Sequence, residues 1–151
     1  MLISLVRHGA AEEGSPDADR NLSAQGLVQS QTVAKKFKLY APEVDKAMMS
    51  PYQRAKQTAA VYREVFPSLS FEESEAIAPN ADVYDLMQVI EQSGNRHLLM
   101  VSHNPLLSRL LSLMLDGTTE SMRPFPTSKL VCIEMDVIAP GCGELQYTME
   151  S

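Results

Sequence analysis

The chain is poor in cysteine, lacks tryptophan and carries no excess of positive charge. Only Cys132 and Cys142 occur in 151 residues, and their spacing is not that of a paired zinc site, so we expect two free thiols. The net charge of −6, with no cluster of lysines and arginines, argues against a nucleic-acid groove. The apolar residues 1–6 are far shorter than the roughly 20 residues of a membrane span and lack the basic region of a signal peptide. These absences predict a cytoplasmic protein with no nucleic-acid or membrane partner.

The length and the hydrophobic pattern predict one domain, residues 1–151, with its own core. Four β-rich runs alternate with four helical patterns; the runs cover 2–7, 44–49, 69–73 and 97–102, and the helical patterns 23–40, 51–66, 83–93 and 105–115. This alternation implies parallel strands joined by right-handed crossovers, with helices on both faces of the sheet. Residues 129–138 and 144–149 predict a closing hairpin. The predicted fold class is α/β, in three layers, with a mostly parallel sheet and a C-terminal antiparallel hairpin.

Basic side chains stand just past three of the predicted strands. Arg7 and His8 end the first run, Arg54 follows the second, and His103 follows the run 97–102. In an open α/β sheet, ligands bind beyond the carboxyl ends of the strands, where loops converge and helix N-termini offer amide donors to anions. Two histidines and two arginines at such an edge predict phosphate chemistry.

A neutral imidazole can attack a phosphoryl group and form a phosphohistidine that water then hydrolyses. His8 is the candidate nucleophile, and we expect a backbone carbonyl in the turn after Gly9 to hold its ring in one tautomer. The planar forks of Arg7 and Arg54 match two phosphoryl oxygens each, and His103, if protonated, adds a third cationic donor. No metal or other cofactor is expected, since zinc at the two histidines would lack a third ligand and be repelled by the arginines.

Three strings resemble the histidine phosphatase superfamily: Val6-Arg7-His8-Gly9, the segment 50–58 around Arg54, and Ser102-His103-Asn104-Pro105. The short length and the segment 20–26 are most similar to the small SixA-type phosphohistidine phosphatases. The resemblance implies a phosphoglycerate-mutase-like fold and phosphatase activity. It also implies a set of site residues: a nucleophile at His8, phosphate-binding arginines at Arg7 and Arg54, and a second phosphate-contacting histidine at His103.

Two further residues are candidates at this site. Larger members of the superfamily carry a carboxylic acid after the third strand that protonates the leaving oxygen, and Glu75 is the nearest candidate here, in a pattern that departs from theirs. An alkoxide needs such an acid, whereas a phosphorylated imidazole leaves readily once it is protonated, so the departure favours a phosphohistidine substrate. Arg20 either lines the phosphate mouth or ties down the loop 10–21.

The leading hypothesis is therefore a phosphatase that removes phosphate from a phosphohistidine of a signalling or phosphotransfer protein, through a phospho-His8 intermediate. One alternative is a small-molecule phosphomonoesterase that uses the same four residues with an added acid. The other is a non-catalytic module that binds phosphate or phosphohistidine. We expect a monomer whose partner is a phosphohistidine-bearing protein or a small phosphorylated substrate.

Overall fold

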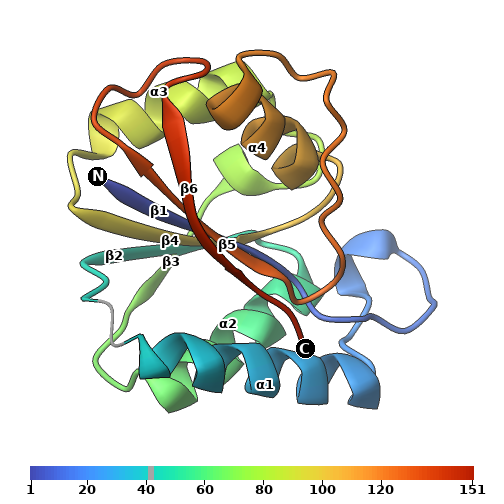
Figure 1. Ribbon diagram of the computed structural model, residues 1–151. Helices are drawn as coiled ribbons and strands as arrows, with labels where there is room; N and C mark the ends of the chain where they lie inside the picture. The colour runs from blue at the N-terminus through green and yellow to red at the C-terminus, as the bar shows by residue number, and fades with distance from the viewer. Residues whose placement is uncertain (41–42) are drawn as a thin grey trace.

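A six-stranded mixed sheet forms the centre of the computed structural model, which describes residues 1–40 and 43–151 (Figure 1). Its strand order is β3-β2-β4-β1-β5-β6. The strands are β1 (Leu2–Arg7), β2 (Lys46–Met49), β3 (Phe71–Glu73), β4 (His97–Ser102), β5 (Leu130–Met135) and β6 (Gly143–Met149). β1, β2, β3 and β4 are mutually parallel, and β5 joins β1 antiparallel and forms a hairpin with β6. The predicted mostly parallel sheet with its closing hairpin is confirmed.

Helices cover both faces of this sheet. They are α1 (Ala24–Leu39), α2 (Gln53–Val65), α3 (Val83–Ser93) and α4 (Leu106–Asp116), with the short 3-10 turns η1 (Asp17–Asp19) and η2 (Glu75–Ile77). In Figure 1, α3 and α4 lie above the sheet and α1 and α2 below it. The predicted three-layer α/β architecture is therefore confirmed. No helix in the described ranges is both long and apolar enough to cross a membrane.

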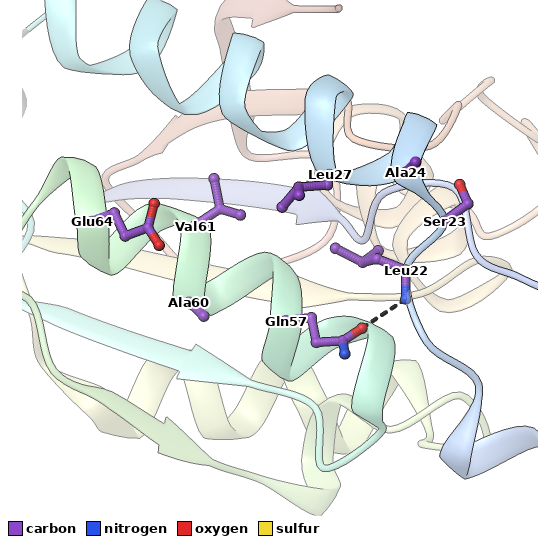
Figure 2. Close-up of a pocket in the computed structure, with 8 residues that line it drawn as sticks. All are labelled: Leu22, Ser23, Ala24, Leu27, Gln57, Ala60, Val61 and Glu64. Atoms are coloured by element: carbon purple, nitrogen blue, oxygen red, sulfur yellow. Dashed lines mark hydrogen bonds between the residues drawn. The ribbon is translucent and has the colours of Figure 1, made fainter.

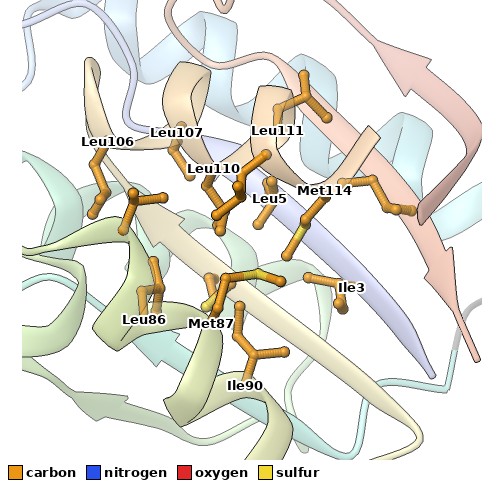
Figure 3. Packing of buried hydrophobic residues seen from close by; sticks show 14 of the residues in the cluster. Ile3, Leu5, Leu86, Met87, Ile90, Leu106, Leu107, Leu110, Leu111 and Met114 are labelled. Atoms are coloured by element: carbon orange, nitrogen blue, oxygen red, sulfur yellow. The ribbon is translucent and has the colours of Figure 1, made fainter. Parts of the chain in front are cut away.

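Two hydrophobic clusters, one on each face, hold the layers together. Figure 3 shows Ile3 and Leu5 of β1 facing the leucine stripe of α4 and the inner face of α3. Every residue of β4 is buried, because this strand lies between β1 and β2 and beneath helices on both faces. A firmly buried β4 and β1 give the loops at their carboxyl ends a rigid base.

Local signals set most element boundaries. Ser23 caps α1 by accepting the amide hydrogen of Gly26, and Gly94 ends α3 in the left-handed conformation with φ of 62°. Pro51 and Pro105 stand before their helices instead of in the first turn, because Tyr52 is the extended N-cap of α2 and Pro105 itself is the N-cap of α4. The second and third strands also begin later than predicted, at residues 46 and 71.

Candidate active site

The carboxyl ends of β1 and β4 bring the two predicted histidines together. Arg7, the last residue of β1, pairs in register with Ser102, the last residue of β4, so that His8 and His103 leave the sheet side by side. Their ring centroids are 5.0 Å apart, and both side chains are buried. The parallel pairing of β1 with β4 thus brings His8 and His103, some 95 positions apart in the sequence, into one cluster.

The hydrogen bonds of His8 assign its tautomer. Its Nδ1 lies 2.7 Å from the carbonyl oxygen of Gly9, which can only accept, so Nδ1 carries the proton. Its Nε2 accepts from Nε of Arg54 at 3.2 Å. Burial, the Arg54 charge and the Arg7 charge lower the pKa of His8 to about 4, against the opposing effect of the Gly9 bond. The ring is therefore neutral at pH 7, with the lone pair of Nε2 on the side of Arg54.

Gly9, the residue that orients His8, is itself held in place. The amide of Gly9 donates to Thr58 Oγ1 at 3.1 Å, and Thr58 donates in turn to the carbonyl of Arg54 at 2.9 Å. A Cβ on Gly9 would overlap the carbonyl oxygen of Gly26, so the turn can approach α1 only because residue 9 has no side chain. The expected carbonyl in the turn after the strand is that of Gly9.

Arg54 lies in the first turn of α2 and is almost fully buried. Besides its bond to His8, it donates to the carbonyl oxygen of Asp17 at 2.8 Å and to Oδ2 of Asp17 at 3.2 Å. The other carboxylate oxygen of Asp17 accepts from Arg20 at 3.0 Å. Sequence reasoning missed Asp17, because it stands in a polar loop with no periodic pattern.

Arg7 and His103 each hold a buried nitrogen without a hydrogen-bond partner among the described residues: Nε of Arg7 and Nδ1 of His103. Arg7 also donates through Nη1 to the carbonyl of Phe125 at 3.0 Å. Ser50 Oγ accepts from the Tyr52 amide and lies 2.7 Å from His103 Nε2, so Ser50 and this ring nitrogen share one hydrogen bond. Nε of Arg7 is a donor that a bound oxyanion can satisfy, and Nδ1 of His103 is a second such donor in the tautomer in which Ser50 donates to Nε2.

The charge state of His103 differs from the expectation of a third cation. Burial, followed by the nearby His8 and Arg54, lowers the pKa of His103 to about 3. Burial and the Arg54 charge also lower the pKa of Arg7, in the direction expected for crowded cations. In the free protein the His103 ring is therefore neutral, and an anion between these groups would raise the pKa of its ring.

Comparison with known proteins identifies the family of the chain. Residues 3–78 match the family model of the histidine phosphatase superfamily (branch 1). The chain belongs to the histidine phosphatase superfamily. It is 28% identical to the phosphohistidine phosphatase SixA of Escherichia coli strain K12 over 144 residues, which cover 90% of this chain and 86% of that one. The SixA homolog of Haemophilus influenzae is 31% identical over 124 residues, 74% of this chain and 76% of that one.

A solved structure of the protein histidine phosphatase SixA complexed with tungstate has the same fold. It superposes with a TM-score of 0.84 at 27% identity, over 99% of this chain and 97% of that chain. The phosphoglycerate-mutase-like fold expected from the resemblance is thereby confirmed.

The superfamily resemblance left open the roles of Glu75 and Arg20. Glu75 is exposed on η2 and, within the described chain, makes no hydrogen bond or ion pair with His8, His103 or either arginine of the cluster. Arg20 both ties the loop, donating to the Glu12 carbonyl at 2.8 Å, and lies close enough for its charge to lower the pKa of His8. Arg20 therefore stands at the mouth of the cluster, and Glu75 stands apart from it.

A shallow groove of about 310 Å³ runs between α1 and α2 beside this superfamily site (Figure 2). Apolar side chains of Leu22, Leu27 and Val61 line it, and Glu64 stands at one end. Gln57 joins the groove to the mouth loop by accepting the Leu22 amide and donating to Asn21. None of the four basic residues lines the groove, so it is a neighbour of the anion site and not part of it.

Proposed function

We propose that this protein is a metal-independent phosphatase that removes the phosphoryl group from phosphohistidine on a protein, through a phosphorylated His8. The observation that carries the proposal is the state of His8: a neutral ring with its proton on Nδ1, so that Nε2 is unprotonated and its electron pair accepts a hydrogen bond from Arg54, which a phosphoryl oxygen can take over when substrate binds. That is the state an imidazole nucleophile needs. Arg7, Arg54 and His103 are the proposed phosphate-binding residues.

In the first step, Nε2 of His8 attacks phosphorus while the bond from phosphorus to the substrate nitrogen breaks. The bonding electrons return to the leaving imidazole, which departs neutral when its far nitrogen already carries a proton. His8 becomes positively charged as the new bond forms, and its Nδ1–H bond to the Gly9 carbonyl stabilises that charge. The donors of Arg7, Arg54 and His103 stabilise the three phosphoryl oxygens in the transition state.

In the second step, water attacks phosphorus and the bond to Nε2 of His8 breaks. The electron pair returns to Nε2, both water protons end on the released inorganic phosphate, which leaves as H2PO4⁻, and His8 regains its starting tautomer. Water attacks from the side that the substrate nitrogen has left, opposite His8. The same arginines can therefore bind the phosphoryl oxygens in both steps.

Three observations support phosphohistidine as the substrate class. The two relatives at 28% and 31% identity are named phosphohistidine phosphatase SixA and its homolog. Among the described residues Glu75 makes no hydrogen bond or ion pair with the cluster, so it is not held there as an acid for an alkoxide leaving group. Between β1 and α1 the chain at this edge of the sheet consists only of residues 8–23, which supports access for a loop or helix of a protein partner.

The test is steady-state hydrolysis without added metal of two substrates, a phosphohistidine-bearing phosphotransfer domain and p-nitrophenyl phosphate, by the wild type and by His8→Ala. We expect rapid loss of phosphate from the phosphotransfer domain by the wild type and none above background by His8→Ala, with thermal unfolding showing that the variant folds. Efficient turnover of the small ester alone, abolished by Glu75→Gln, would instead indicate a phosphomonoesterase. Activity on neither would leave the non-catalytic binding module.

A further inference from the structure

The mechanism above makes no use of Asp17, although this carboxylate contacts the centre of the site. Its Oδ2 lies 3.2 Å from Nη2 of Arg54, and its Oδ1 lies 3.0 Å from Nη1 of Arg20. The backbone carbonyl of Asp17 accepts a further bond from Nη1 of Arg54. Its side chain nevertheless keeps 56% of its surface exposed. The hydrogen bond from Arg20 holds the pKa of Asp17 below its usual range, so the group is an anion.

An anion at this position is unfavourable for a site that only binds phosphate. Asp17 takes up hydrogen-bond donors of Arg54 that would otherwise be free for phosphoryl oxygens, and its charge repels a phosphate dianion. The same charge favours a cation that lies next to the phosphate. A protonated imidazole attached to phosphorus is such a cation.

The position of Asp17 suits the ring of the leaving group. In-line attack by His8 puts the leaving nitrogen on the far side of phosphorus, toward the solvent-exposed mouth. The loop that carries η1 projects beyond the carboxyl ends of the strands on that side (Figure 1). Asp17 is also near enough to His103 for its charge to act on that ring, so it borders the cluster as well as the mouth.

We propose that Asp17 is a specificity-determining residue that accepts a hydrogen bond from the ring N–H of the leaving phosphohistidine. This inference rests on the proposed function and deepens it. The carboxylate stabilises the protonated ring, so that P–N cleavage expels a neutral imidazole and no proton has to arrive during the step. Asp17 stays ionised throughout and is not a general acid.

The chain provides a matched control. Asp19 lies on the same 3-10 turn and is exposed, but it makes no hydrogen bond to Arg54 or Arg20 within the described residues. Asp17→Asn and Asp19→Asn therefore remove the same charge two positions apart. Asparagine keeps an oxygen that can accept from Arg54, and Asp17→Ser supplies a second uncharged variant should the first fail to fold.

The experiment compares kcat/KM on two small substrates, the phosphohistidine amino acid and p-nitrophenyl phosphate, so that no protein docking surface enters the comparison. Asp17→Asn should lose about tenfold or more on phosphohistidine, as expected for one hydrogen bond between charged groups, and should keep or gain activity on the aryl ester. Asp19→Asn should change neither. An equal fall on both substrates would show that Asp17 only positions Arg54, and no change would show that it has no role.

The two proposals fail differently in this design. If the wild type hydrolyses the aryl ester but not phosphohistidine, the proposed function is wrong and the inference falls with it. If the wild type hydrolyses phosphohistidine and Asp17→Asn keeps the wild-type ratio of the two substrates, the inference alone is wrong.

Discussion

Replacing Thr58 by valine tests the hydrogen-bond chain that orients the proposed nucleophile. The two side chains are nearly equal in volume, and Thr58 is fully buried, so the change removes a hydroxyl without opening a cavity. The Gly9 amide then loses its acceptor at 3.1 Å and is left buried without a partner. Such a loss costs about 1–3 kcal/mol. The Arg54 carbonyl also loses the bond from Thr58 Oγ1. It still has its place in the backbone hydrogen bonding of α2, so this loss costs less.

If Thr58→Val lowers the free energy of unfolding by about 2 kcal/mol, the Tm of a domain of this length should fall by about 6 °C. Calorimetry or circular dichroism measures this shift. The same residue, Gly9, supplies through its carbonyl the oxygen that holds His8, so we expect kcat on phosphohistidine to fall roughly tenfold from the loss of ring orientation. Thr58→Ser keeps the hydroxyl and should retain most activity while losing some stability through its missing methyl group. A valine variant with unchanged Tm and unchanged kcat would refute the reasoning.

Three further outcomes follow from the site. In ¹⁵N NMR of the free protein, His8 and His103 should stay neutral well below pH 6.5 and gain protons only near pH 4 and pH 3, respectively. The free energy of unfolding that depends on these neutral rings is full above pH 6.5 and is lost as the pH falls through those values. A titration near 6.5 for either ring would contradict the assigned burial. Arg54→Lys should lower kcat/KM by roughly 10–100-fold, because lysine cannot bond His8 and the phosphoryl oxygens together, and an unchanged value would remove Arg54 from the site. Gly26→Ala should reduce the yield of folded protein or its Tm markedly, because the added methyl group would overlap the Ala10 carbonyl; a wild-type Tm would show that this turn can shift.

Much of the fold could be predicted from local patterns. The apolar run that became β4 is short and continuous, as expected of a strand buried on both faces, and the leucine stripe of α4 has the spacing of a helix. The convergence of Arg7, His8 and His103 followed from the rule that carboxyl ends of parallel strands share one edge, with no need to know the pairing in detail.

What could not be predicted depends on contacts between distant loops. Asp17 meets Arg54 across 37 positions, and Ser50 meets His103 across 53, through segments that carry no periodic signal. The neutral state of His103 depends on how deeply the folded chain buries it beside His8, which composition does not reveal. The late start of β2 has a similar cause: the Asp45 carboxylate accepts the amides of Arg96 and His97 at the point where a longer strand was expected.

The central claim is that His8 carries the phosphoryl group between the two steps. The most direct measurement is rapid quenching of the wild-type protein in base during turnover of a phosphohistidine-bearing domain, followed by mass spectrometry of its peptides under conditions that preserve phosphoramidates. We expect an acid-labile addition of one phosphoryl group on the peptide that contains His8, absent from His8→Ala. Turnover with no phosphoryl group on His8 at any quench time, or turnover that persists in His8→Ala, would contradict it.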